Sequence, residues 1–503
     1  MEKKIPKPTK NEIACNGPIP GDVSLYEKEF EASQKLSTPG YYKSLNSAEI
    51  ADGQRSGIFP NASFTGSFTE ENQVFAYRSE DIYEDTAYII NREPGEIYIV
   101  GGESPPMKGK LPAGPYIAKA DAATGKQIWR TYLDNGNISG RWIANANLNI
   151  HENGYIIFAW ANQLVKVDPD TGRVLKQNSI PTGDTPIIDA NFKHVTFAPD
   201  GTVILKDQTR PTGCTYQGTM AVVKGKMEGL KQTNSHLVAA DPDTLEILDH
   251  ISLPEPATAP HIVTMFEGKI AIYMGVDSGA LRCFWDGKKK KLTLDPSWVI
   301  KPLKEGQSAC DAPSILGDWI ILQTNGIGSD TVASSVVAVS QKDPSKMKVI
   351  FPFGDLKKGH WSFAPPKATA DPDNNLIYSA DMGMKKVACI SIDPKSGEME
   401  VKYTVDDITN TFQPLIGPKD KRVLILSNIK QDIKIEPVKI ALFTAKYKEQ
   451  VTWRDANTGK IIAESDFFEP LTINSLIVPG FGGRFYFPTA NGFIILQVVP
   501  KRK

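Results

Sequence analysis

The stretch Leu164-Val-Lys-Val-Asp168-Pro-Asp-Thr-Gly172-Arg-Val-Leu175 decides the fold, because the chain repeats something close to it along most of its length. Two runs that alternate apolar and polar residues flank an Asp-x-x-Thr-Gly turn. This pattern predicts an antiparallel β-hairpin whose tight turn needs glycine for a positive φ. The hairpin is therefore the predicted repeating part of the structure.

The copies of this hairpin share two strand patterns joined by a polar turn, in most cases with an aspartate. They lie at 116–129, 164–175, 237–248, 281–292, 336–349, 387–401 and 451–462. They recur at intervals of roughly fifty residues, and a strand-built period of that size is typical of a propeller, a solenoid or an array. Four strand patterns per unit favour a propeller.

The two ends of the chain predict how the ring closes. Residues 475–499 contain three strand patterns and lack a fourth. A ring must pair its two ends or leave open sheet edges. The strand pattern at Gln73–Tyr77 is therefore expected to complete the last blade, which gives an all-β, eight-bladed β-propeller of four-stranded blades. We expect residues 1–72 to form an arm, with one helix within 23–36, that packs on a propeller domain of residues 73–503.

The bulk composition excludes several functional classes. With 41% hydrophobic and 23% charged residues, the chain of 503 residues can bury a large core. A net charge of -1 without a basic, aromatic-rich face argues against nucleic-acid binding. No apolar stretch approaches the roughly 20 residues that span a bilayer. Five scattered cysteines without a C-x-x-C pair argue against a disulfide framework and a thiolate zinc site.

The N-terminal segment bears on location. Residues 1–10 have the positive charge of a signal peptide's first region, but no apolar region follows them. We therefore expect a periplasmic or secreted protein whose leader has been removed, or else a cytoplasmic protein. The expected ligand is a small molecule, and a protein partner stays open as a further alternative.

The repeated phrase Ala/Val-x-Asp-x-x-Thr-Gly-Lys-x-x-Trp/Ile, as at 116–129 and 451–462, resembles the quinoprotein-like (PQQ-like repeat) propellers. The resemblance covers almost the whole chain after residue 80. Those families typically have eight blades, and they include alcohol dehydrogenases and non-enzymatic assembly scaffolds. The motif indicates the fold and says little about chemistry, because its Asp and Gly build turns.

The resemblance leaves the cofactor open between pyrroloquinoline quinone, a metal ion and none. The family's dehydrogenases hold the quinone between an adjacent-cysteine disulfide and a tryptophan, with calcium near the catalytic aspartate. This sequence has no adjacent cysteines and no spaced acidic loop typical of calcium sites. Two histidines at channel positions are also fewer than a copper or zinc site held mainly by imidazole needs. We therefore transfer no catalytic residue from the family.

Candidate catalytic residues come from the segments that lead into the innermost strands, where the blades converge on the axis. His261 and His360 stand at the same place in their blades and are predicted to act as acid and base. Asp311 or Asp189 would orient them. A histidine bonded to a backbone carbonyl is the alternative for either one. His151, His194, His236 and His250 are expected to be structural.

Candidate substrate-binding residues lie on the same predicted face. Arg141 would hold an anion while Trp142 stacks on a ring, or else Arg141 would tie neighbouring blades together. Trp361 follows His360 and would stack in the same way. The insertion 206–235, with Arg210 and Tyr216, would cover the channel mouth or form a plain surface loop.

These observations predict an enzyme that acts on a small polar or aromatic molecule in the axial channel. Its chemistry would be His/Asp acid–base catalysis of the lyase or hydrolase type. The first alternative is a quinone- or metal-dependent oxidoreductase of the quinoprotein-like family. The second is a non-catalytic binding or assembly propeller.

Overall fold

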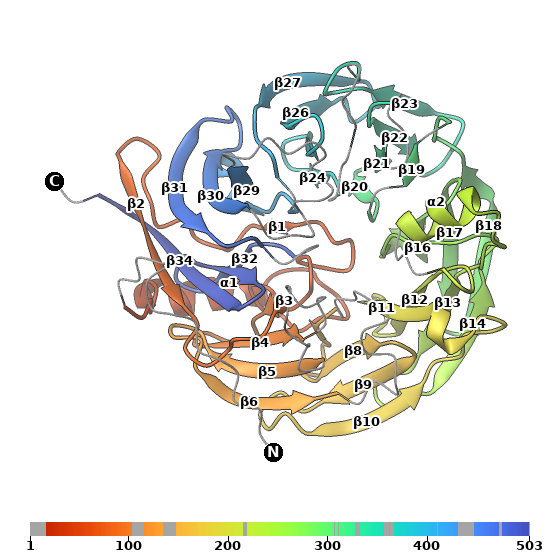
Figure 1. The fold of residues 1–503 in the computed structure, drawn as a ribbon, viewed down its shortest axis with the longest axis horizontal. Coiled ribbons are helices and arrows are strands. Elements are labelled where there is room, and N and C mark those ends of the chain that lie inside the picture. The colour runs from red at the N-terminus through yellow and green to blue at the C-terminus, as the bar shows by residue number, and fades with distance from the viewer. Residues whose placement is uncertain are drawn as a thin grey trace.

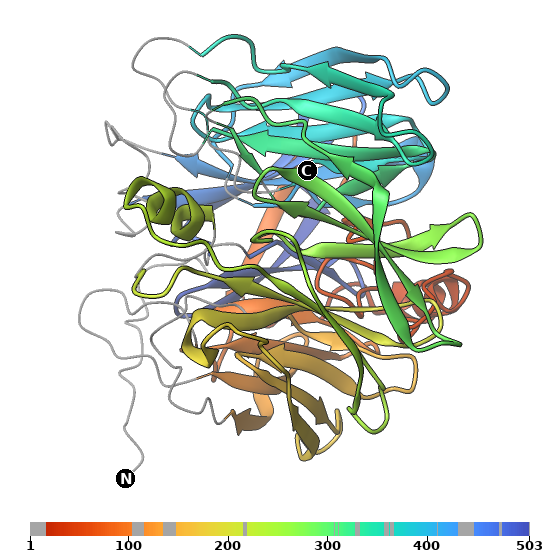
Figure 2. The same ribbon diagram turned by 90° about the vertical axis from the view of Figure 1, so that its right-hand side faces the viewer.

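The computed structural model describes residues 17–102, 115–133, 147–214, 219–305, 307–309, 311–326, 332–356, 362, 367–409, 411–430, 447–471 and 475–501. Its strands form eight sheets arranged in a ring (Figure 1). The prediction of an all-β, eight-bladed propeller is confirmed. Two short α-helices, α1 (Tyr26–Gln34) and α2 (Thr219–Met227), lie on opposite faces of the ring (Figure 2). None of the helices in the described residues has the length and apolar character to cross a membrane.

The eight blades follow one another along the chain. Blade one contains β3 (Thr86–Ile90), β4 (Glu96–Gly101), β5 (Tyr116–Asp121) and β6 (Gln127–Tyr132), and blade two contains β7 (Asn149–Ile150), β8 (Ile156–Trp160), β9 (Gln163–Val167) and β10 (Val174–Ser179). Blade three contains β11 (Ala190–Phe197), β12 (Val203–Thr209), β13 (His236–Ala240) and β14 (Ile247–Ser252), and blade four contains β15 (His261–Phe266), β16 (Lys269–Val276), β17 (Gly279–Asp286) and β18 (Lys291–Ile300).

Blades five to eight continue the same order, except that two short strands share the inner position of blade five. Blade five contains β19 (Ser308–Ala309), β20 (Ser314–Leu316), β21 (Trp319–Asn325), β22 (Val336–Ser340) and β23 (Met347–Ile350), and blade six contains β24 (Thr369–Asp371), β25 (Leu376–Asp381), β26 (Lys386–Ile392) and β27 (Met399–Val405). Blade seven contains β28 (Leu415–Ile416), β29 (Val423–Lys430), β30 (Lys448–Asp455) and β31 (Ile461–Phe468), and blade eight contains β32 (Val478–Gly480), β33 (Arg484–Thr489) and β34 (Gly492–Pro500).

The last blade is closed by the N-terminal part of the chain, as predicted. Strand β2 (Asn72–Arg78) pairs antiparallel with β34 from Asn72 opposite Pro500 to Arg78 opposite Ile494. The strand order of this sheet is β2-β34-β33-β32. Strands from the two ends of the chain therefore pair in the last blade, which closes the ring.

The repeated turns hold neighbouring blades together. In the turn after β9, Asp168 Oδ1 accepts hydrogen bonds from the backbone N–H groups of Asp170 at 2.8 Å and Thr171 at 3.2 Å. Gly172 follows with a φ of 72°, and the indole of Trp129 from blade one covers it. A Cβ atom on Gly172 would lie 2.5 Å from that ring. Glycine is thus needed for both the backbone angle and the close approach.

The same contact recurs around the ring. Trp319 of blade five covers Gly397 of blade six and donates its Nε1–H to a backbone carbonyl of the same turn at 3.0 Å. Tyr403 of blade six covers Gly459 of blade seven in the same way, with a hydrogen bond of 2.7 Å from its hydroxyl to Ala456 O. The repeated motif therefore encodes blade-to-blade packing.

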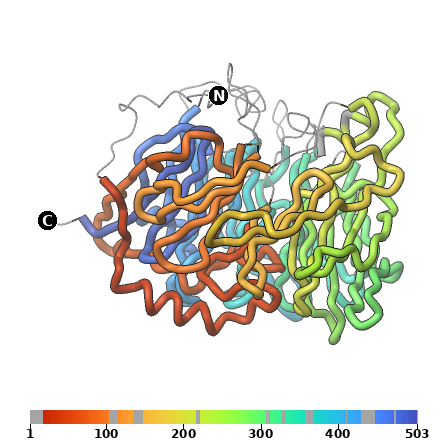
Figure 3. The backbone as a smooth tube through the Cα atoms, turned by 90° about the horizontal axis from the view of Figure 1, so that it is seen from below, coloured from red at the N-terminus to blue at the C-terminus, as the bar shows by residue number. Residues whose placement is uncertain are grey.

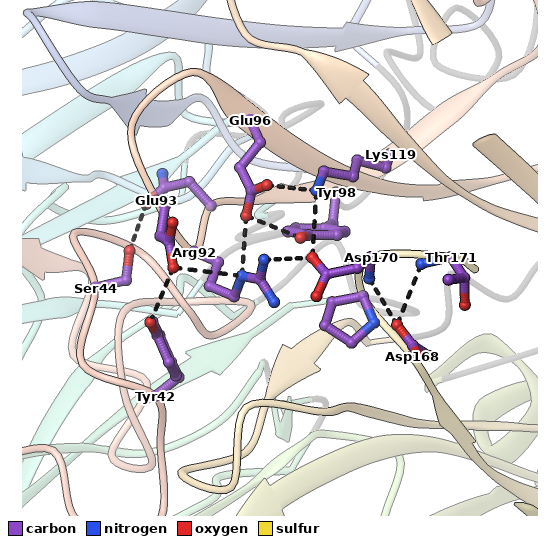
Figure 4. A network of polar contacts seen from close by, with 12 residues as sticks. Tyr42, Ser44, Arg92, Glu93, Glu96, Tyr98, Lys119, Asp168, Asp170 and Thr171 are labelled. Carbon is purple, nitrogen blue, oxygen red and sulfur yellow. Dashed lines mark hydrogen bonds and ion pairs between the residues drawn. The ribbon is translucent and has the colours of Figure 1, made fainter. Parts of the chain in front are cut away.

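Charged side chains reinforce this packing between the first two blades (Figure 4). Arg92 reaches Asp170 of blade two with Nη2 at 2.6 Å and bonds Glu96 in its own blade with Nε at 3.0 Å. Lys119 Nζ lies 2.5 Å from Glu96 Oε2. The hydroxyl of Tyr42, from the N-terminal arm, donates to Glu93 at 3.3 Å. The network joins the arm and blades one and two.

The N-terminal arm crosses one end of the ring axis, along the lower edge of the ring in Figure 3. Backbone carbonyls of Asn46, Ser47, Gly53 and Gly57 accept hydrogen bonds from N–H groups at the innermost strands of blades one, two, four and seven, at 2.8 to 2.9 Å. Strand β1 (Ile58–Phe59) pairs parallel with β28 beside the centre of the ring (Figure 1). The arm thus contacts inner strands all around the axis. The division into domains 1–72 and 73–503 stays a prediction.

Candidate functional site

Arg55 of the arm lies at the centre of a buried group of charged side chains on the axis. Its side chain is buried and bonds Glu49 through two nitrogens, with Nη2 to Oε1 at 3.0 Å. The charge of Arg55 also acts on side chains from blades one, three, four, five and six: Tyr88, His194, His261, Asp311 and Lys367. We call these residues, with Glu49 and Lys206, the axial cluster.

The backbone of the arm is shaped to aim Arg55 at this place. Arg55 has a φ of 52° and Ala51 a φ of 69°, both in the left-handed region. Asp52 stabilises the loop between them, since its Oδ1 accepts the N–H groups of Gln54 at 2.9 Å and Ser56 at 3.1 Å. Such a conformation costs about 1 kcal/mol or more for a residue other than glycine. The unfavourable backbone conformation of this loop positions the guanidinium of Arg55 in the cluster.

Two lysines of the axial cluster are buried without a carboxylate bonded to them. Within the described residues, the acceptors for Lys206 Nζ are the carbonyls of Asp207, at 2.6 Å, and Ala257. Lys367 Nζ donates to the carbonyl of Pro313 at 3.2 Å. Burial lowers the pKa of Lys206 to about 7 and also lowers the pKa of Lys367. A bound anion would stabilise the charged form of both side chains.

The histidines of the axial cluster are neutral at pH 7. Burial, and next the charge of Lys206, holds the pKa values of His194 and His261 well below 6.5. His261 Nε2 lies 2.6 Å from Thr196 Oγ1. The Nδ1 atoms of both histidines have no hydrogen-bond partner among the described residues. Buried polar atoms normally find partners, so this is a place for a polar ligand or water.

The structure places some of the predicted site residues in this cluster. Both His261 and Asp311 belong to it, but no hydrogen bond joins the two in the described part of the chain. Loss of contact with water raises the pKa of Asp311, against the opposing charge of Arg55. A neutral His261 bonded to Thr196 is thus compatible with the predicted base, and its orientation by Asp311 stays a prediction.

Two other predicted residues pair with each other. Arg210 Nε donates to Asp189 Oδ1 at 3.0 Å, and both side chains are buried. Arg210 Nη2 also donates to the carbonyl of Ile188 at 3.2 Å. This ion pair ties the segment that leads into β11 to the end of β12. The other predicted site residues, Arg141, Trp142, Tyr216, His360 and Trp361, lie outside the described residues.

Comparison with known proteins supports the fold. No known family matches the sequence, and no curated protein matches it. A quinohemoprotein alcohol dehydrogenase from Pseudomonas putida superimposes with a TM-score of 0.57 at 9% identity, over 95% of this chain and 82% of that one. The corresponding enzyme from Comamonas testosteroni gives 0.53 at 10% identity, over 96% and 85%. A europium-containing methanol dehydrogenase gives 0.51 at 9% identity, over 91% and 90%.

The chain has the quinoprotein-like eight-bladed β-propeller fold. At identities near 10%, the likeness extends to the fold alone. The chemistry of this quinoprotein-like propeller must therefore be argued from its own residues.

The axial cluster meets part of what pyrroloquinoline quinone would require. That quinone carries three carboxylates, and Arg55, Lys206 and Lys367 are buried cations that suit such groups. The sequence has no adjacent cysteines for a disulfide against the ring. The described residues also contain no group of three or more His, Cys, Asp or Glu side chains that could hold a metal ion. The cluster therefore offers positive charge for acidic groups, although Arg55 is already paired with Glu49.

Sequence reasoning missed the arm and lysine members of the cluster. Glu49 and Arg55 lie in a segment without strand or helix periodicity, so nothing in the sequence predicts that they reach the axis. The sequence does give one indication that Lys206 is buried. It follows the apolar run 203–205, which is typical of a strand with both faces covered. Its side chain is fully buried.

Proposed function

We propose that this propeller binds a small anionic molecule at the axial cluster and works as an oxidoreductase with that molecule. The observation that supports binding is the pair of buried lysines, Lys206 and Lys367, whose acceptors in the described residues are backbone carbonyls. The charges of Asp207 and Asp311 act on Lys206, and those of Asp311 and Asp52 act on Lys367, but none of these carboxylates is bonded to either lysine among the described residues. A bound anion would give the buried ammonium groups a direct partner.

The redox part of the proposal is supported by the fold. Three quinoprotein-type dehydrogenases resemble more than nine-tenths of this chain. A bound quinone would supply two-electron oxidation chemistry. In that arrangement the lysines and Arg55 would hold the acidic groups, and the Nδ1 atom of His261 would accept a proton from a hydroxyl group beside it. The predicted periplasmic or secreted location remains part of this proposal.

A second candidate is acid–base chemistry on a small polar molecule without a redox cofactor, of the lyase or hydrolase type. Among the described residues the Nδ1 atoms of His194 and His261 have no hydrogen-bond partner, which favours this candidate, because a neutral imidazole with a free nitrogen can act as a base. A backbone hydrogen bond at Ile204 acts in addition on the His261 ring. The two candidates share the axial cluster and differ in whether the bound molecule is a chromophore.

The test is to purify the protein from its native host, record its visible spectrum and identify any molecule released on acid denaturation by mass spectrometry. We expect one anionic molecule per chain, and a visible absorption band if it is a redox quinone. The double variant Lys206→Met/Lys367→Met should lose at least nine-tenths of it. Lys288→Met, which changes an exposed lysine, is the matched control. A colourless anion would favour the second candidate. A double variant that keeps its ligand would overturn the axial site.

A further inference from the structure

Blade three contains a second group of ionisable side chains, which the axial proposal does not use. Asp207 lies near the C-terminal end of β12 and is fully buried. It is hydrogen-bonded to His236, the first residue of β13. Its Oδ1 accepts the backbone N–H of His236 at 2.6 Å, and its Oδ2 lies 2.7 Å from Nδ1 of the same histidine. A carboxylate in this position keeps the proton on Nδ1, so the lone pair of the neutral ring is on Nε2.

A second histidine stacks on the first. The rings of His236 and His250 are 5.2 Å apart between centroids and 18° from parallel. They come from adjacent strands, with His236 opposite Ser252 and His250 opposite Val238. Burial, and next the proximity of His236, lowers the pKa of His250. The Nε2 atom of His250 has no hydrogen-bond partner within the described ranges.

Both histidines line a cleft of about 520 Å³. This volume is in the range of small-molecule sites. The other walls are polar and include Asp184 and Thr185 from the segment before β11, and Lys231 and Asn234 from the insertion before β13. A molecule in the cleft would find hydroxyl and amide groups, the carboxylate of Asp184 and the ammonium group of Lys231 beside the imidazoles.

Gly183 lies against Nε2 of His236 at the wall of this cleft. Gly183 has a φ of 53°, and a Cβ atom built on it would lie 2.7 Å from His236 Nε2. Any larger residue would therefore cover the nitrogen. Among the described residues Nε2 makes no hydrogen bond, although the residue is buried and Nδ1 of the same ring makes a short one. Nε2 is thus the ring nitrogen that a molecule in the cleft could contact.

We propose that this cleft is a second active site, in which His236 is the general base for a water molecule or hydroxyl group and the ligand is a small polar molecule with an acidic group facing Lys231. In the proton-transfer step, the O–H bond breaks, its electron pair stays on oxygen, and the proton moves to Nε2. Asp207 stabilises the resulting imidazolium through Nδ1–H. Against an ester, the oxygen then bonds to the acyl carbon, the alcohol leaves with the proton, and the base is regenerated. The site adjoins the axial cluster, because Lys206 Nζ donates to the backbone carbonyl of Asp207 at 2.6 Å.

The first experiment uses p-nitrophenyl acetate as the probe with the full chain. We expect a saturable hydrolysis whose rate rises with pH as an imidazole loses its proton. The charged or titratable groups around the histidine pair are Asp207, Asp249, His250, Asp184 and Lys231. His236→Gln should lower kcat/KM at least tenfold, and Asp207→Asn should lower it and change the pH profile. The exposed-lysine variant Lys288→Met should leave the rate unchanged.

The second experiment keeps the proposal testable if His236→Gln fails to fold. Diethyl pyrocarbonate acylates accessible imidazole nitrogens, and mass spectrometry reports each site. We expect His236 to react at least tenfold faster than His151, whose Nε2 bonds Gly201 O at 2.9 Å. Gly183→Val should block both this reaction and ester hydrolysis. Gly213→Ala is the control, because Gly213 also has a positive φ but no atom within 4 Å of its Cβ position. An unreactive His236, or a Gly183→Val protein as reactive as the wild type, would overturn the proposal.

Discussion

The outer turns and the axial cluster use the same kinds of charged residue in opposite ways. In the turn after β26, Asp393 Oδ1 accepts the N–H groups of Lys395 at 2.9 Å and Ser396 at 2.7 Å, and the side chain is exposed. These hydrogen bonds, foremost the one from Ser396, lower the pKa of Asp393. On the axis, loss of hydration raises the pKa of Asp311 and lowers the pKa of Lys206.

The difference separates charged residues that stabilise the fold from charged residues that lower its stability. An aspartate in an outer turn is satisfied by its own backbone and remains hydrated, so it defines a turn at little cost. The axial charges lose hydration and leave several polar atoms without described partners. Such a group is costly for stability alone.

Removal of the central guanidinium should have the largest effect. Arg55→Met leaves Glu49 buried without its partner, and we expect a loss of about 3–5 kcal/mol in the free energy of unfolding, measured with denaturant. The double variant Arg55→Met/Glu49→Gln should recover most of it. Arg92→Met, which breaks the pairing with the exposed Asp170, should cost about 1 kcal/mol. Equal losses for Arg55→Met and Arg92→Met would remove the distinction between axis and outer turns.

The outer turns should be sensitive to shape rather than to charge. Gly172→Ala adds a methyl group against the Trp129 ring at a positive φ, and we expect a loss of about 2–3 kcal/mol. Gly154→Ala places the same methyl group at a φ of 86° with no atom within 4 Å, so only the backbone strain of about 1 kcal/mol remains. Thermal unfolding of the two variants measures the difference. If they lose the same stability, the Trp129 contact contributes nothing.

The buried histidines should make the protein sensitive to acid. Below pH 6.5 the unfolded chain binds a proton at His194 and at His261 that the folded chain excludes. Stability therefore falls as the pH falls, by up to about 1.4 kcal/mol per pH unit for each histidine. Unfolding measured between about pH 7 and pH 5 should show this slope, and His194→Gln/His261→Gln should reduce it. A slope that the double variant leaves unchanged would mean that other groups dominate.

The sequence was sufficient for the fold because the fold is periodic. The Asp-x-x-Thr-Gly turns, the four-strand blades and the closure of the last blade by Gln73–Tyr77 follow from local patterns and from the need to close a ring. The short helix expected within 23–36 is also present, as α1. These features depend on residues close together in sequence, or on a general rule about sheet edges.

The sites are harder to predict from the sequence because the contacts between their residues are not periodic. His261 and Asp311 are expected near the axis from their positions before inner strands, and this stays a prediction. The charge of Arg55 acts on both from a segment more than 200 residues away. His236 and His250 are expected to be structural because His236 lies in a strand pattern and His250 near the end of a hairpin. The hydrogen bond from His236 to Asp207 joins residues 29 positions apart, which no strand pattern predicts.

The most direct test of the central claim is a ligand titration followed by thermal unfolding. Pyrroloquinoline quinone and, as a tricarboxylate without redox chemistry, citrate would be added to the wild-type protein and to Lys206→Met/Lys367→Met. We predict that at least one of these anions stabilises the wild type saturably, by about 2.7 kcal/mol at a hundred times its Kd, and leaves the double variant unchanged. If neither anion stabilises the wild type, or if the double variant responds equally, the axial cluster does not bind anions.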